Sequence, residues 1–203
     1  MRSIRSGCRA RLAGELCGRI LDCGSGEDLF GPLLRRSGNE VISLDPDIKA
    51  LRRTAGRRVA GSCAALPFAD DTFTAVWACA VIEHVAEDTL PEMIRVTQPG
   101  GRIIAVTPNP HSPFDQMKRV TGLMTWDTTP GHVRLYHLED LEAYGPVHGE
   151  LMWLPFLERF FWRRPRMGHV FILDVRVTES LKEKMRRGPP ERVTGAAPAA
   201  HRP

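Results

Sequence analysis

The stretch RILDCGSG, residues 19–26, decides the fold. Its apolar part predicts a buried strand over Arg19 to Cys23, and the glycines that follow predict a tight turn into a helix. Such a turn lets the backbone approach a ligand closely, and the free N–H groups at the start of the next helix favour polar ligands. The stretch therefore predicts a strand, a ligand-binding turn and a helix, in this order.

Outward from this stretch, apolar runs alternate with helical patterns. Further strands are expected at 40–45, 58–60, 73–79, 102–107, 147–153 and 169–177. Helices are expected at 28–36, 46–54, 87–97 and 138–144. Alternation of this kind is typical of parallel sheets with crossover helices. We expect one Rossmann-like α/β domain, doubly wound, with a mostly parallel seven-stranded sheet and an antiparallel last strand.

The composition of the 203 residues, 42% hydrophobic and 26% charged, fits a single globular domain. The longest uncharged run, Ile103 to Phe114, is too short to span a bilayer, and residues 1–16 lack the apolar stretch of a secretory signal. Five cysteines without a Cys-x-x-Cys pair argue against a disulfide framework and against a zinc site, so no metal is expected. We expect a cytoplasmic protein.

Charge is distributed unevenly along the chain. Both ends are basic and the middle is acidic, which argues against a nucleic-acid partner and favours solvated charge at the ends. We expect the domain to cover 1–187 and a disordered tail to cover 188–203. Aromatic and arginine side chains gather in 151–166, which predicts a lid or a dimer contact; the alternative is peripheral contact with an anionic membrane or with a lipid-like substrate.

Two carboxylates indicate the ligand. Asp45 ends the second expected strand, where an acid can accept hydrogen bonds from both hydroxyls of a ribose. A dinucleotide-binding turn needs a third glycine at position 29, but Leu29 stands there, which argues against a nicotinamide-dependent oxidoreductase. Asp22 would repel a pyrophosphate but suits a ligand with an ammonium group. These features favour S-adenosylmethionine.

Four segments resemble the successive motifs of class I S-adenosylmethionine-dependent methyltransferases, in particular the small-molecule enzymes of the ubiquinone and menaquinone pathways. The segments are ILDCGSGEDL (20–29), VISLDPD (41–47), GSCAALPFADDTFTAVWACAVIEHV (61–85) and MIRVTQPGGRIIAVTPN (93–109). The resemblance covers about 19–145. It implies methyl transfer from S-adenosylmethionine, with S-adenosylhomocysteine as product, to a small molecule whose oxygen, nitrogen or carbon is methylated.

The resemblance also implies roles for particular residues. The cofactor would be bound by Asp22, Cys23, Gly24, Ser25, Gly26, Asp45, Pro46, Ser62, Cys63, Cys79 and Ala80. At the acceptor, His84 is the candidate base and Glu83 a polar positioning residue. His132, Arg134 and Tyr136 are candidates for binding the substrate.

Two departures from the family pattern leave an alternative open. Ser62 stands where relatives usually have an Asp that binds the adenine amino group, and few residues precede the first strand. The second departure predicts an open site, or one covered by a second copy or another partner. The alternative function is a non-catalytic binding or scaffold protein with the same fold.

Overall fold

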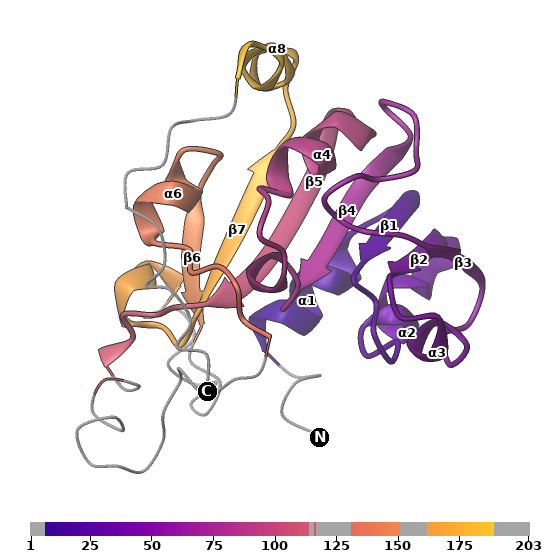
Figure 1. Cartoon of the computed structure of the whole chain (residues 1–203), viewed down its shortest axis with the longest axis horizontal. Coiled ribbons are helices and arrows are strands. Elements are labelled where there is room, and N and C mark those ends of the chain that lie inside the picture. Colours follow the sequence, from indigo (N-terminus) through magenta and orange to yellow (C-terminus); the bar gives the residue numbers. More distant parts are fainter. Residues whose placement is uncertain (1–6, 114–115, 117–130, 151–161, 189–203) are drawn as a thin grey trace.

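The computed structural model describes residues 7–113, 116, 131–150 and 162–188. Its centre is one sheet of seven strands in the order β3-β2-β1-β4-β5-β7-β6 (Figure 1). The strands are β1 (Arg19–Cys23), β2 (Glu40–Asp45), β3 (Arg57–Ala60), β4 (Phe73–Cys79), β5 (Thr97–Pro108), β6 (Val147–Glu150) and β7 (Val170–Arg176).

The predicted sheet is confirmed. β1 lies between β2 and β4, and all neighbours from β3 to β5 pair in parallel. β7, the last strand in the chain, pairs antiparallel with both β5 and β6. Parallel pairing brings the carboxyl ends of β1, β2 and β4 to one edge of the sheet, which is where ligands bind in folds of this kind.

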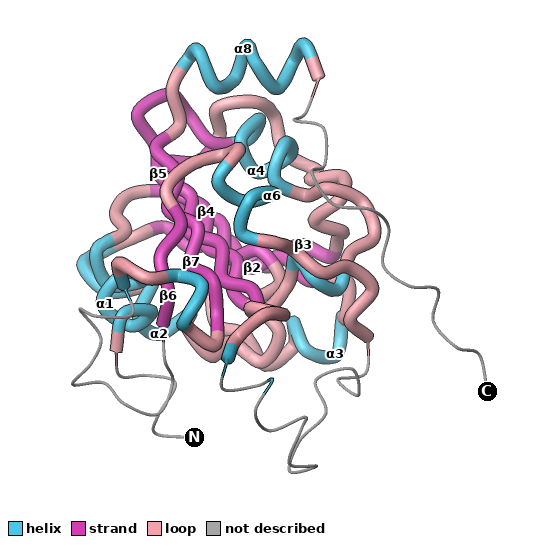
Figure 2. Tube along the Cα trace, turned by 90° about the vertical axis from the view of Figure 1, so that its left-hand side faces the viewer, coloured by secondary structure: helices cyan, strands magenta, loops and turns pink. Residues whose placement is uncertain are grey.

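Alternating side chains on the strands fill two hydrophobic clusters, one on each face of the sheet. Leu21, Val76 and Ile103 belong to the first cluster, whereas their neighbours Ile20 and Ile104 belong to the second. Helices cover both faces of the sheet (Figure 2). Both faces are therefore dry, which explains the nearly continuous apolar runs of the central strands.

The helices are shorter than the sequence suggests. They are α1 (Cys8–Glu15), α2 (Gly31–Leu34), α3 (Ile48–Leu51), α4 (Leu90–Val96), α6 (Leu138–Glu142) and α8 (Glu179–Arg187), with one-turn 3₁₀ helices η2 (Arg36–Gly38), η3 (Ile82–His84) and η6 (Pro165–Met167). The helix expected from residue 28 was wrong in its start, because Asp28 has a left-handed φ of 65°. The helix expected from Pro46 begins later, because the Asp47 side chain caps it by accepting from the Lys49 amide.

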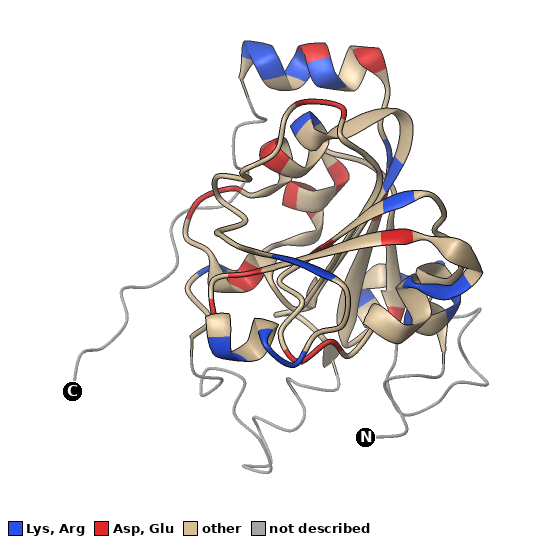
Figure 3. Cartoon of the chain, turned by 90° about the vertical axis from the view of Figure 1, so that its right-hand side faces the viewer, with Lys and Arg blue, Asp and Glu red and all other residues tan. Residues whose placement is uncertain are grey.

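Two helices escaped the sequence analysis, α1 and α8. α1 packs Cys8, Leu12 and Ala13 into the second cluster, although its basic composition suggested a solvated end. Thr178 caps the start of α8, because its hydroxyl accepts from the Leu181 amide. Most of its side chains are charged, so its narrow apolar face gave little signal (Figure 3).

α8 lies far from the ligand-binding edge of the sheet. It follows β7, whose last residue, Arg176, pairs with Arg102 in the first half of β5 (Figure 1). The tail expected at 188–203 lies outside the described residues from 189 on. Within the part of the chain that the structure describes, no helix has the length and apolar character needed to cross a bilayer.

Ile104 and Ile48 allow a direct test of the two-faced core. Ile104 is fully buried in β5, whereas Ile48 is 58% exposed. Ile104→Ala should lower the free energy of unfolding by about 2–5 kcal/mol, because it leaves a cavity in a packed core. Ile48→Ala, the matched control, should change it by less than about 0.5 kcal/mol. Urea unfolding followed by circular dichroism measures both values, and equal losses would contradict the assignment of the core.

Candidate active site

The turn after β1 is anchored to the end of β2. The amides of Gly24 and Ser25 both donate to the Leu44 carbonyl, at 2.7 and 3.0 Å. Gly24 and Gly26 have left-handed φ values of 69° and 50°, which explains why glycine is needed there. These amides are therefore used inside the protein. The expectation that free amides at the next helix hold the ligand is not met, because α2 is one turn long and begins only at Gly31.

Asp45 also stabilises this turn. Its Oδ2 accepts from the Gly26 amide at 2.9 Å, and its Oδ1 accepts from the Asp47 amide at 2.8 Å. Each carboxylate oxygen can accept a further hydrogen bond, and the side chain is partly exposed. The acid at the end of β2 thus combines a structural role with capacity for a hydroxyl-bearing ligand.

Gly24 touches the segment that follows β4. A Cβ atom on Gly24 would lie 2.2 Å from Cγ2 of Val81, so no side chain fits there without displacing Val81. Ala80, next to Val81, has a left-handed φ of 57°, and its amide donates to the Val106 carbonyl at 2.9 Å. A non-glycine residue in this conformation is strained, and such strain is common at functional sites.

A cavity of about 170 Å³ opens between the ends of β1 and β4. Five residues expected to bind the cofactor line it, namely Asp22, Gly24, Ser25, Cys79 and Ala80. Asp22 Oδ2 and Ser25 Oγ are buried and have no hydrogen-bond partner within the described chain. Orphaned buried polar atoms facing a cavity indicate a ligand with complementary polar groups.

Burial dominates the electrostatics of Asp22. It raises the pKa of the carboxyl to about 7, with a further contribution from the charge of Asp28. Arg35 lowers this pKa, but by less than burial raises it. An ionised Asp22 is therefore costly in the protein alone, and a cationic group in the cavity would offset that cost.

The cavity is also lined by Arg9, Leu29, Phe30 and Trp77, which the sequence analysis did not select. Arg9 comes from α1 and is 6% exposed, so the interpretation of the basic N-terminal end as solvated charge was wrong for this residue. Its Nε pairs with Glu150 of β6 at 2.5 Å. α1 thus closes part of the site that we expected to be open, and no local sequence signal joins residue 9 to residue 150.

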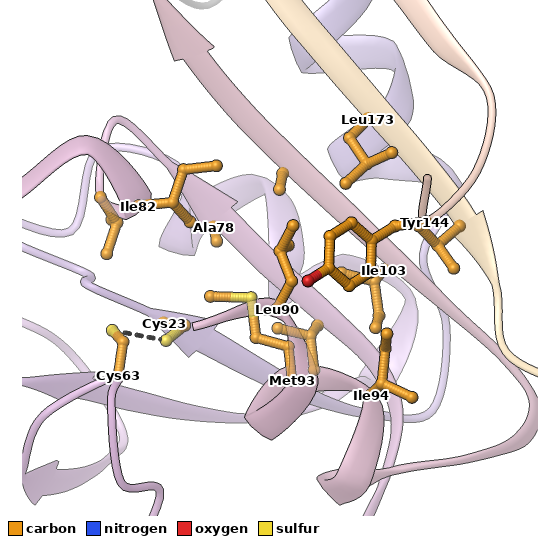
Figure 4. Packing of buried hydrophobic residues seen from close by; sticks show 14 of the residues in the cluster. Cys23, Cys63, Ala78, Ile82, Leu90, Met93, Ile94, Ile103, Tyr144 and Leu173 are labelled. Atoms are coloured by element: carbon orange, nitrogen blue, oxygen red, sulfur yellow. Dashed lines mark hydrogen bonds between the residues drawn. The ribbon is translucent and has the colours of Figure 1, made fainter. Parts of the chain in front are cut away.

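The remaining residues expected at the cofactor do not line this cavity. Cys23 and Cys63 are buried beneath the turn with their sulfur atoms 2.7 Å apart (Figure 4). This contact and burial raise the pKa of Cys23 well above its usual value. Pro46 and Ser62 are exposed beyond the ends of β2 and β3. Their part in ligand binding stays a prediction.

The segment after β4 forms η3 and carries both candidate catalytic residues. His84 is exposed, and Glu83 is only 2% exposed, so Glu83 is not the surface acid that its charge would suggest. Burial raises the pKa of Glu83. Cys79, the last residue of β4, lines the cavity, and burial raises the pKa of its thiol to about 12. Cys79 is thus neutral and unsuited to act as a nucleophile.

The three residues expected to bind substrate differ in their surroundings. His132 lies beside His84, with the ring centres 4.8 Å apart. Arg134 and Tyr136 are buried instead, with the Arg134 guanidinium 4.5 Å from the Tyr136 ring and 3.4 Å from Asp88. The structure gives Arg134 and Tyr136 a packing role, and their contact with a substrate stays a prediction.

Most of the aromatic segment 151–166 lies outside the described residues, which resume at 162. Trp162 stacks on His148 with ring centres 3.9 Å apart, and the Arg11 guanidinium lies 5.4 Å from its ring. This aromatic residue therefore packs on the domain. For the rest of the segment, a lid or dimer contact and a membrane contact both stay predictions.

Asp22 should make stability depend on pH. The pKa is about 7 in the folded chain against 3.8 for an ordinary Asp, so the unfolded chain loses this proton first and stability falls as pH rises between these values. Asp22→Asn should raise the free energy of unfolding by about 2–4 kcal/mol at pH 8 and change it little near pH 4. Thermal and urea unfolding at both pH values measure this difference.

A matched control removes the same charge from the surface. Glu87 is exposed, so Glu87→Gln should alter stability by less than about 0.5 kcal/mol at either pH. An Asp22→Asn effect of equal size at pH 4 and pH 8 would contradict burial as the cause.

The comparisons with known proteins agree with this geometry. Residues 21–105 match the family described as methyltransferase domain. The chain is 37% identical over 91 residues to a demethylmenaquinone methyltransferase of Mycolicibacterium paratuberculosis, covering 42% of this chain and 40% of the relative. A Renibacterium salmoninarum protein of the same name is 36% identical over 93 residues, covering 42% and 39%. The chain thus spans about two fifths of the length of these curated relatives.

Solved structures share the fold over a larger part of the chain. A SAM-dependent methyltransferase from Archaeoglobus fulgidus superposes with a TM-score of 0.59 at 18% identity, covering 82% of this chain and 91% of that one. A chain in a Haloferax volcanii complex containing the Trm112 methyltransferase activator gives a TM-score of 0.62 at 17% identity, covering 84% and 89%. The match over residues 21–105 is to a methyltransferase domain, and the fold is the one seen in S-adenosylmethionine-dependent methyltransferases.

Proposed function

We propose that this chain transfers a methyl group from S-adenosylmethionine to a small-molecule acceptor. One observation carries the proposal: the unpartnered, buried oxygen of Asp22 at the cavity between β1 and β4. A carboxylate in this position favours a ligand with a positive charge, and S-adenosylmethionine has an ammonium group and a sulfonium. The nicotinamide dinucleotides carry a pyrophosphate instead, which Asp22 would repel.

The residues present fit this cofactor. Asp22 and Ser25 offer the orphaned oxygen atoms to its amino acid end, and Asp45 has acceptor capacity left for ribose hydroxyls. When bound, S-adenosylmethionine supplies an electrophilic methyl group. Phe30 and Trp77, whose rings lie 4.8 Å apart, exclude water from the cavity wall.

The protein acts mainly by positioning. Cys79 is neutral, so the chain offers no thiolate there for a methylated intermediate, and direct transfer to the acceptor is the simpler course. Holding the acceptor atom and the methyl group in line at close approach supplies much of the rate. His84 Nδ1 is bonded to the Gly131 carbonyl at 2.9 Å, which leaves Nε2 for the acceptor side.

The acceptor proposed here is a small molecule, with a quinone-like ring as the first candidate. The basis is the similarity to two demethylmenaquinone methyltransferases. Lipid-like molecules and secondary metabolites are the other candidate acceptors. The methylated atom can be oxygen, nitrogen or carbon, so a screen of acceptors should include all three kinds. A second copy or another partner near α1 also stays a proposal, since one structural neighbour comes from a complex with an activator.

Two variants test the cofactor site. Gly24→Ala places a Cβ against Val81, and Asp45→Ala removes the acceptor beside the turn. Asp45→Ala should weaken S-adenosylmethionine binding by at least about tenfold, the effect of losing a hydrogen bond to a charged group. Gly24→Ala should weaken it because the added Cβ displaces Val81 or the turn itself. Titration calorimetry measures the affinity. Gly14→Ala is the matched control, because a Cβ there meets nothing within 4 Å.

The same titrations decide between the candidate functions. NADH should not bind at concentrations that saturate S-adenosylmethionine binding. Wild-type affinity in both Gly24→Ala and Asp45→Ala would show that the pocket is wrongly assigned. Binding without methyl transfer to any acceptor in a screen would favour the non-catalytic alternative.

His84→Ala tests the acceptor side. If His84 takes a proton from the acceptor, its loss should slow turnover by ~10²–10⁴-fold, as removal of a base does. The affinity for S-adenosylmethionine should stay within about twofold, because His84 does not line the cofactor cavity. A loss of turnover rate below about tenfold would show that His84 does not act as a base and that positioning of the substrates suffices.

A further inference from the structure

Three side chains with metal-binding atoms meet beside the end of β4. Glu83 and His84 belong to η3, and His132 comes from the segment before α6. One ligand atom from each lies within 4.8 Å of the others. Two imidazoles and one carboxylate form a common set of ligands for divalent transition metals.

Backbone hydrogen bonds hold the two segments together. The Glu83 carbonyl accepts from the amides of Val133 and Arg134, at 3.0 and 3.1 Å. The Gly131 carbonyl lies 2.9 Å from His84 Nδ1. A carbonyl only accepts, so Nδ1 carries the proton and Nε2 presents its lone pair. A backbone carbonyl that fixes the tautomer in this way is typical of metal-binding histidines.

Glu83 is the second, independent sign of a ligand. Its carboxyl is 2% exposed, and neither oxygen has a hydrogen-bond partner of ordinary geometry among the described residues. A buried acid without a satisfying partner is costly, so its presence calls for a cation.

We propose that Glu83, His84 and His132 bind one divalent transition-metal ion, with Zn²⁺ as the probe of choice. A tetrahedral ion with bonds of about 2.1 Å sets its ligands about 3.4 Å apart, so binding would draw these side chains closer together. Three protein ligands leave a coordination position open. The exposure of His84 places that position toward solvent, where an acceptor can enter.

Another histidine pair in the described chain is less suited to a metal. His111 Nε2 and His137 Nδ1 bond to each other at 2.8 Å, which occupies one nitrogen of each ring. His137 also begins α6 as its cap. Among the described residues, no acid or cysteine completes a three-ligand group with this pair, so His111 serves as a matched control.

The consequence for catalysis rests on the proposed function. Glu83 follows Cys79 and Ala80, which line the cofactor cavity, by only a few residues. A metal there can bind an acceptor hydroxyl and lower its pKa, as it lowers that of water. The acceptor class would then be a hydroxyl compound with a neighbouring oxygen that completes a chelate. In this arrangement the metal, and not His84 as a base, would favour loss of the proton.

The first experiment measures metal binding alone. The full chain is stripped with a chelator and titrated with Zn²⁺ against a competing indicator, and Co²⁺ substitution gives a visible spectrum. We expect one ion per chain. Glu83→Gln and His132→Ala should weaken binding by at least about 100-fold, since even second-shell losses reach 10–100-fold. His111→Ala should bind as the wild type does.

The outcomes are distinct. Zn²⁺ affinity weaker than about 10 μM, equal binding by Glu83→Gln and His132→Ala, or loss of binding in His111→Ala would overturn the proposal. Circular dichroism checks the fold of each variant, and His132→Gln replaces any variant that does not fold. Zn²⁺ should also raise the melting temperature of the wild type and not that of Glu83→Gln.

The second experiment separates this proposal from the proposed function. S-adenosylmethionine affinity should be unchanged by Glu83→Gln or by the chelator, whereas Asp45→Ala, which lies apart from η3, should lose the cofactor and keep Zn²⁺. Turnover of an accepted hydroxyl substrate should stop with the chelator and return with Zn²⁺. Full turnover in metal-free protein would overturn the catalytic role, and absence of any turnover with intact Zn²⁺ binding would count against the proposed function only.

Discussion

The position of β1 between two parallel neighbours governs the whole structure. Its pairing with β2 and β4 brings Asp22, Asp45 and Cys79 to one edge, although 57 residues separate the first from the last. The Leu44 carbonyl then accepts from two successive amides of the turn and fixes it against β2. Every element of the candidate site is placed relative to this anchored turn.

The site keeps two acids buried at a cost in stability. Asp22 lies two residues before Gly24 and Glu83 two residues after Val81 in the sequence, and burial raises the pKa of both acids. Neither carboxyl gains a compensating ion pair of close geometry among the described residues. Each is better explained by a ligand than by folding, since buried acids without partners stabilise nothing. In the proposed arrangement, Asp22 serves the cofactor and Glu83 the acceptor side.

The sequence predicted the sheet well because its strands are buried on both faces and read as apolar runs. It predicted the turn and the positions of Asp22 and Asp45 at the ends of β1 and β2, because acids near strand ends followed by glycines form a local pattern; their roles in binding stay predictions. It failed for Arg9, because the contact with Glu150 joins opposite parts of the chain. It also failed to link Glu83 with His132, because the backbone hydrogen bonds that join their segments produce no periodic pattern in the sequence. Helix ends were wrong where side chains such as Asp28 adopt unusual backbone angles.

The contact between Gly24 and Val81 restricts which substitutions positions 24 and 81 can accept. Val81 occupies the space that any side chain at position 24 would need, and the left-handed φ of Gly24 adds a further penalty. A larger residue at 24 is tolerable only together with a smaller one at 81. That exchange would also shift the segment that carries Glu83 and His84. The two positions therefore vary as one unit, and sequence drift at the cofactor turn cannot proceed independently of drift at the acceptor side.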